Sequence, residues 1–277
     1  MKSLDKIKKI MKAKIEKNEK LALIFYIVIG VMIVLCLIRQ LMNQDYFNVL
    51  LCVLSLFLIT IPFIIEKRTK IELPQTLEII IICFVFFAEI LGEIRNFYFY
   101  IPVWDTILHT ATGCLAASVG FGAIDLINTH VKKISMTPFF VVAVAFCFSM
   151  TIAVGWEFFE YGADELLRTD MQKDRVVSEI STVYLDETNT NTPIKLDDIG
   201  KTIIYDSKGN ELATVDGYLD IGIKDTMKDM FVNMVGAVVF SAFAYLYMKK
   251  SDKYKFVEGL VISENISKKS AENNAST

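Results

Sequence analysis

The stretch LALIFYIVIGVMIVLCLIRQL, residues 21–41, contains no charged side chain before Arg39. About 20 residues of helix, rising 1.5 Å per residue, cross the hydrocarbon core of a bilayer, so this run predicts a transmembrane helix. Five further, mostly apolar runs follow at 47–65, 77–101, 104–127, 138–162 and 228–248. The sequence therefore predicts an all-α polytopic membrane protein, a six-helix transmembrane bundle.

The charged residues are concentrated between these runs, although 53% of the 277 residues are hydrophobic and the formal net charge is only -3. Lysine and arginine occur in the first 20 residues, in 66–76, in 128–137 and from Lys249 onward. Because such residues mark the cytoplasmic ends of spans, we expect a multi-pass protein of the plasma membrane with both termini in the cytoplasm. Its expected partner is the lipid bilayer; we expect no nucleic-acid partner, and the sequence identifies no protein partner.

Residues 1–20 carry eight lysines and three acids. Leu4, Ile7, Met11 and Ile15 recur at spacings of three to four residues, which predicts a basic amphipathic helix lying on anionic lipids. A solvated lysine-rich tail is the alternative interpretation of the same segment.

A small β-rich insertion is expected on the outer side, between the fifth and sixth spans. Residues 165–224 are polar, with strand-like pieces at Arg175–Leu185, Thr202–Tyr205 and Glu211–Val215. The last two flank Asp206–Asn210 and predict a hairpin. The expected organisation is 1–20 as the amphipathic helix, 21–164 as the first five spans, 165–224 as the insertion, 225–250 as the sixth helix, and 251–277 as a disordered cytoplasmic tail.

Polar residues at helical spacing interrupt four of the predicted spans. A charge near the middle of the bilayer costs on the order of 3 kcal/mol, so such residues mark functional sites more often than chance would. With the predicted topology, all of them fall in the outer half of the bilayer. The sequence therefore predicts one binding cluster made of Glu89, Glu93, Asp105, His109, Glu157, Glu160, Asp225, Asp229 and Asn233.

Less specific interpretations of these residues stay open. Asp105 and Asp225 can cap the first turns of their helices, and His109 can make a single satisfied hydrogen bond. The whole set can also be a structural cluster that joins helices through hydrogen bonds.

A cluster that is rich in carboxylates and holds one imidazole suits a divalent metal ion, for which His109, Glu157 and Asp229 are the candidate ligands. No motif identifies a nucleophile, so catalytic residues are unknown. We therefore expect an outward-facing pocket that binds a cation or a polar head group. The alternatives are a metal-dependent intramembrane enzyme acting on a lipid head group and a proton- or cation-coupled transporter.

Three motifs follow one another along the chain: W-D-x-x-x-H-x-x-x-G at 104–113, W-E-x-x-E at 156–160, and D-x-x-x-D-x-x-x-N-x-x-G-A at 225–237. This succession resembles the YjdF-like inner-membrane proteins, a family of unknown function, and is more distantly similar to VanZ-like membrane proteins. The resemblance covers roughly 77–248. It implies the membrane architecture and the polar cluster, and it brings no settled reaction. VanZ-like proteins are associated with reduced susceptibility to glycopeptide antibiotics, which would point to envelope lipids or antibiotics as targets.

Overall fold

A computed structural model describes residues 19–68, 71–130 and 136–264. The chain divides into two compact units. Unit 1 comprises Met1–Thr151 and Val232–Thr277, and unit 2 comprises Ile152–Phe231. Both boundaries fall inside long helices, α8 (Pro138–Leu167) and α9 (Ile223–Lys249), so each of these helices contributes residues to both units.

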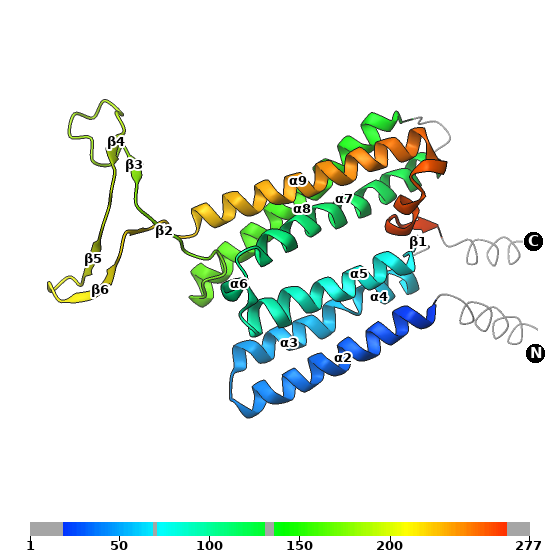
Figure 1. Ribbon diagram of the computed structural model, residues 1–277, viewed down its shortest axis with the longest axis horizontal. Coiled ribbons are helices and arrows are strands. Elements are labelled where there is room, and N and C mark those ends of the chain that lie inside the picture. The colour runs from blue at the N-terminus through cyan, green and yellow to red at the C-terminus, as the bar shows by residue number, and fades with distance from the viewer. Residues whose placement is uncertain (1–18, 69–70, 131–135, 265–277) are drawn as a thin grey trace, which may run out of the picture. The chain divides into compact units, whose positions relative to one another are not determined.

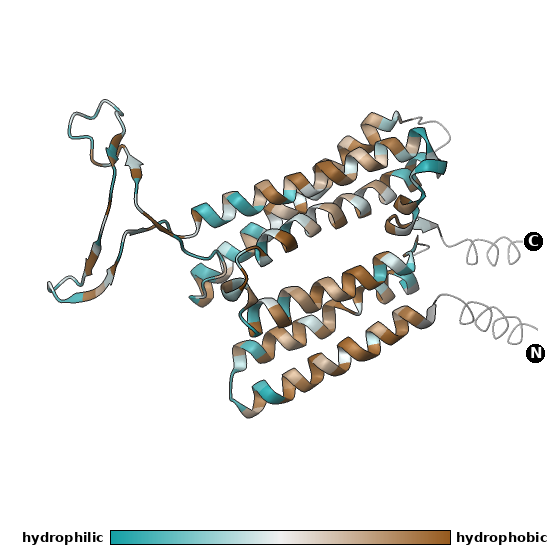
Figure 2. Ribbon diagram, in the orientation of Figure 1, coloured by the Kyte–Doolittle hydropathy of each residue, from teal (hydrophilic) through white to brown (hydrophobic). Residues whose placement is uncertain are grey.

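Unit 1 is built from helices. Its elements include α2 (Glu19–Met42), α3 (Tyr46–Leu58), α4 (Ile61–Arg68), α5 (Gln75–Val85), α6 (Phe97–Tyr100) and α7 (Trp104–His130). Helix α2 packs against both α3 and α5, and the three lie side by side in Figure 1. Most of their surface is apolar, as the brown colour in Figure 2 shows.

Five helical segments of the described residues are long and apolar enough to cross a membrane: Leu21–Met42, Tyr46–Glu66, Trp104–Asn128, Pro138–Leu167 and Ile223–Lys249. They agree with five of the six predicted spans. The second combines α3 and α4, which are separated by a turn at Ile59–Thr60.

The predicted third span, 77–101, is not a single α-helix. The α-helix α5 passes directly into a π-helix, η1 (Phe86–Ile94), which ends before α6. Asn96 has a φ of 58°, a left-handed conformation that an α-helix does not contain, and this residue separates η1 from α6. The sixth crossing of the membrane therefore stays a prediction.

Three apolar clusters among the described residues form the core of unit 1, and the smallest holds Leu73, Leu77 and Ile262. Ile33, Cys52 and Ile82 belong to a cluster that joins α2, α3 and α5. Another cluster joins α7 to the parts of α8 and α9 that lie in this unit, and includes Phe121 and Phe240. Many large apolar side chains outside these clusters are exposed, which suits helices whose outer faces contact lipid tails.

The segment after α9 is ordered as far as the structure describes it. The sequence predicts a disordered tail over 251–277, whereas η2 (Ser251–Lys253), η3 (Lys255–Leu260) and β8 (Ser263–Glu264) occupy its first part. Strand β8 pairs antiparallel with β1 (Ile71–Glu72). The physical reason is apolar burial, because Val257 and Ile262 are both buried, and Gly122 leaves room for Ile262. Residues 265–277, and nearly all of the predicted amphipathic helix at 1–20, lie outside the described residues.

Unit 2 contains the β-rich insertion. Its strands form three antiparallel pairs. The pair of β2 (Val176–Val177) with β7 (Tyr218–Leu219) encloses the other two along the chain, which are β3 (Ile180–Thr182) with β4 (Ile194–Leu196) and β5 (Thr202–Tyr205) with β6 (Glu211–Val215). The predicted hairpin is confirmed with its bounds, and Gly209 takes the positive φ of 85° in its turn. The predicted strand Arg175–Leu185 is instead divided between β2 and β3.

Candidate functional site

Asp105 and His109 form a polar pair at the beginning of α7. His109 Nε2 lies 3.3 Å from Asp105 Oδ1, and the two side chains are only 14% and 16% exposed. The i, i+4 spacing places both on one face of the helix. Ile107, between them in sequence, is 56% exposed and lies on a different face. A carboxylate oxygen and an imidazole nitrogen at this separation can either hydrogen-bond to each other or bind one ion together.

Helices α7 and α9 cross very closely within unit 1. A Cβ atom added to Gly113 would overlap the carbonyl oxygen of Asn233, and one added to Gly236 would overlap that of Thr110. Cys114 Sγ donates a hydrogen bond to the carbonyl oxygen of Gly236, 3.2 Å away. Glycine at both positions is what allows the two backbones to approach, as in other tightly packed membrane helices.

The two helices run in the same direction at this crossing. Gly113 lies against Asn233, and Phe121, further along α7, lies against Phe240, further along α9, with ring centroids 6.2 Å apart. Residue numbers therefore increase together on both helices.

Asn233 is the most buried polar side chain of the predicted cluster, at 1% exposure. Its Nδ2 is 3.8 Å from the sulfur atom of Met150, a weak contact, and its buried Oδ1 has no hydrogen-bond partner among the described residues. Beside Met150 in sequence, Ser149 donates a hydrogen bond of 2.9 Å to the carbonyl oxygen of Gly113. The part of α8 in unit 1 thus packs against the same crossing.

Glu89 and Glu93 lie on the π-helix η1, which packs against α7. Glu89 is buried and Glu93 is half-buried. A π-helical turn inside a longer helix is often found at functional sites, because it turns side chains away from their α-helical directions. Apolar composition alone did not predict this change of helix type.

In unit 2, the beginning of α9 holds Asp225 and Asp229, both buried. The guanidinium of Arg175 donates to Asp225 Oδ1 through Nε, at 3.2 Å, and through Nη2. Lys228 Nζ lies 3.6 Å from Asp229 Oδ1. Asp225 is therefore engaged by an arginine of the insertion, which sequence spacing did not predict because the two residues are 50 positions apart.

The end of α8, also in unit 2, holds Glu157 and Glu160, at 6% and 9% exposure. The apolar residues between them, Phe158 and Phe159, are 72% and 51% exposed. Trp156 Nε1 donates a hydrogen bond of 2.8 Å to Glu160 Oε1. The acids are thus turned inward while the aromatic rings face outward, which is the reverse of the pattern in a water-soluble helix.

None of the nine residues of the predicted cluster is exposed. Unit 1 holds five of them, Glu89, Glu93, Asp105, His109 and Asn233, and unit 2 holds Glu157, Glu160, Asp225 and Asp229.

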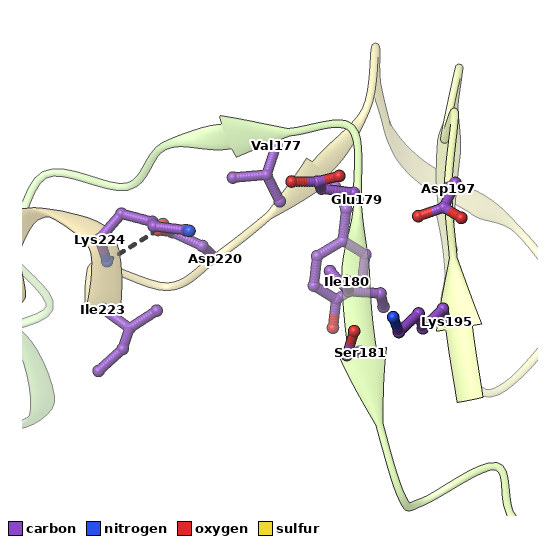
Figure 3. A pocket seen from close by; sticks show the side chains of 10 residues that line it. Val177, Glu179, Ile180, Ser181, Lys195, Asp197, Asp220, Ile223 and Lys224 are labelled. Carbon is purple, nitrogen blue, oxygen red and sulfur yellow. Dashed lines mark hydrogen bonds between the residues drawn. The ribbon is translucent and has the colours of Figure 1, made fainter. Parts of the chain in front are cut away.

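A separate hollow of about 490 Å³ lies in unit 2, at the base of the insertion (Figure 3). Its lining includes Lys195, Lys224, Glu179, Asp197 and Asp220, so acids and bases are mixed. The carboxylate of Asp220 accepts a hydrogen bond of 2.9 Å from the backbone N–H of Lys224. None of the nine predicted site residues lines this hollow.

Comparison with known proteins defines the class to which the chain belongs. Residues 22–250 match the family described as "Predicted membrane protein (DUF2238)", and the chain belongs to this family. It is therefore a membrane protein with several apolar helices, and its function is unknown. The narrower resemblance to YjdF-like and VanZ-like proteins stays a prediction.

The chain is also similar to an individual protein, an uncharacterized protein of Thermotoga maritima. It is 27% identical over 154 residues, which cover 55% of this chain and 75% of the relative. No solved structure matches the chain.

Proposed function

We propose that this membrane protein binds a divalent cation through Asp105, His109 and Asp229. The observation that carries the proposal is the Asp105–His109 pair, which α7 holds in a partly buried position beside its close crossing with α9. A carboxylate and an imidazole are both ligands of divalent transition metals, and on one helix face they lie close enough to reach the same ion.

The continuity of α9 supports the inclusion of Asp229. Helix α9 is unbroken from Ile223 to Lys249, so Asp229 lies one turn before Asn233. His109 lies one turn before Gly113, the residue that Asn233 contacts, and the two helices run in the same direction there. One turn back from the crossing therefore leads to His109 on α7 and to Asp229 on α9.

Asp105 takes the place that the sequence-based prediction gave to Glu157, because Asp105 already lies against His109. Two carboxylates and an imidazole suit Mn²⁺ and Zn²⁺ in particular. A cation held by three protein groups keeps positions open for further ligands, so a polar or anionic lipid head group is a candidate to bind there.

The test is cation binding by the purified full-length protein. We expect the protein in detergent, stripped with a chelator, to bind about one equivalent of Mn²⁺ in a calorimetric titration. Asp229→Asn and His109→Ala should each weaken binding at least about tenfold, because each removes one ligand.

Asp225→Asn is the matched control. It makes the same chemical change one helical turn earlier, at a carboxylate that Arg175 already engages. It should leave Mn²⁺ affinity close to that of the unsubstituted protein. A chain that binds no Mn²⁺ or Zn²⁺, or an Asp225→Asn variant as impaired as Asp229→Asn, would refute the proposed site.

We also propose the topology that the charge pattern predicts: six spans in the plasma membrane, with both termini in the cytoplasm. The basic residues at 66–76 and 128–137 support it. Ser207→Cys, in the insertion, should react with a membrane-impermeant maleimide on intact cells, whereas Ser251→Cys, after α9, should react only in opened cells. Both positions are exposed. The reverse labelling pattern would overturn the orientation.

A further inference from the structure

The carbonyl oxygen of the Asn233 side chain is a buried acceptor without a partner among the described residues. Leaving such a group unsatisfied costs about 1–3 kcal/mol, and folded proteins rarely tolerate it without a reason. An ion that binds the oxygen is one of the few physical explanations for such a group.

The position of Asn233 agrees with that explanation. It lies at the α7–α9 crossing, one turn along α9 from Asp229, and successive residues four apart drift by only about 40° around a helix. The other polar group of the side chain, Nδ2, is directed to Met150 on α8, which leaves Oδ1 as the available acceptor.

We infer that Asn233 Oδ1 is a further ligand of the proposed cation, which makes the site a set of two carboxylates, one imidazole and one amide oxygen. This inference rests on the proposed function and deepens it, because it names a neutral oxygen ligand at the inner end of the site. Three oxygen donors and one nitrogen donor suit Mn²⁺, whose preference is for oxygen ligands.

The readout is the increase in melting temperature that Mn²⁺ produces over the same protein in chelator. A ligand stabilises the folded state according to its concentration relative to its dissociation constant, so this increment reports affinity separately from the intrinsic stability of each variant. Asn233→Ala should reduce the increment and weaken Mn²⁺ binding at least about tenfold. Asn233→Asp adds a third carboxylate, so it should melt lower in chelator and show a larger increment than the unsubstituted protein.

Ser241→Ala is the control. Ser241 lies two turns further along α9, and its buried hydroxyl also has no hydrogen-bond partner among the described residues. The variant should keep the Mn²⁺ increment and affinity of the unsubstituted protein.

The outcomes separate the two proposals. If the unsubstituted chain binds no Mn²⁺, the proposed function fails. If the unsubstituted chain binds Mn²⁺ and Asn233→Ala binds it within about twofold as tightly, the cation site stands and Asn233 is not a ligand. If Asn233→Ala and Asn233→Asp both lower the melting temperature with unchanged increments, Asn233 has only a packing role.

Discussion

Replacing Gly113 by alanine should separate α7 from α9 and destabilise the protein. The added Cβ would overlap the carbonyl oxygen of Asn233 and lie 2.9 Å from the backbone nitrogen of Ala237. Ordinary contacts of a Cβ begin near 3.4 Å, so the second contact alone requires the backbones to move apart by about 0.5 Å. Backbone atoms cannot rotate away as a flexible side chain can, and the helices themselves must shift.

Overpacking of this kind costs about 1–3 kcal/mol of unfolding free energy. We expect Gly113→Ala to lower the free energy of unfolding by that amount, measured by titration from mild detergent into SDS, with a midpoint at a lower SDS fraction. It should also weaken Mn²⁺ binding, because a shift at the crossing displaces His109 relative to Asn233 on the neighbouring helix.

Gly30→Ala is the matched control, since no atom lies within 4 Å of a Cβ added to this glycine of α2. Alanine is the better helix former by up to about 1 kcal/mol, so this variant should be equally or more stable. If Gly113→Ala proves as stable as Gly30→Ala, the close crossing of α7 and α9 is wrong, and with it the argument that brings Asp229 to His109.

Three further predictions concern other parts of the chain. Asp186→Asn should abolish the hydrogen-exchange protection of residues 186–192, measured by mass spectrometry at pH 6, because the carboxylate accepts bonds from three backbone N–H groups of this loop. A double-mutant cycle of Arg175→Met and Asp225→Asn in SDS titrations should give a coupling energy of about 1–2 kcal/mol, modest because Arg175 is 47% exposed. Val257→Ala should lower stability by about 1.5–3 kcal/mol in the same assay, whereas Phe256→Ala, at a side chain that is 54% exposed and meets the Phe243 ring edge to face, should lower it by only about 0.5–1.5 kcal/mol.

The loop prediction carries a pH dependence of defined sign. Hydrogen bonds from the Thr188 hydroxyl and from backbone N–H groups hold the pKa of Asp186 at about 2, below its ordinary value of 3.8. A lowered pKa in the folded state means that the ionised form stabilises the loop above about pH 4 and that this contribution is lost as the pH falls toward 2. Protection of residues 186–192 in the unsubstituted protein should therefore disappear in that range. Protection that persists below pH 2, or that Asp186→Asn retains, would contradict the role of the carboxylate.

Apolar length was sufficient to predict most of the membrane helices. The run at 21–41 became a continuous helix, and the hairpin around Asp206–Asn210 formed with its predicted strands, since a tight turn and flanking β-formers are local signals. The region 77–101 differed because hydropathy reports only how apolar a segment is. It cannot report a change from α- to π-helix at Phe86 or a left-handed residue at Asn96.

The tail shows how average composition conceals a short apolar segment. The segment 251–277 is rich in Ser, Asn and Lys, which predicts disorder, yet Val257 and Ile262 are buried in apolar clusters of unit 1. The glycine that receives Ile262, Gly122, lies in α7, about 140 residues earlier in the chain. Such a long-range fit leaves no periodicity in the tail itself, so a single sequence could not predict it.

Helical spacing predicted which polar residues of α9 share a face, but it could not predict which partner each of them contacts. Asp225, Asp229 and Asn233 step by four residues, so helical spacing places all three on one face. In the structure Asp225 accepts hydrogen bonds from Arg175, and the neighbouring Thr226 accepts one of 2.7 Å from Gln172 Nε2, so the first turn of α9 fastens the insertion. One turn further on lies Asp229, and a second turn leads to Asn233, whose amide oxygen has no such partner among the described residues. The same stripe thus begins as an attachment point and continues as the proposed cation site. Because of this division, two identical substitutions one turn apart should differ in their effect on Mn²⁺ affinity. Asp225→Asn should leave the affinity unchanged, whereas Asp229→Asn should weaken it.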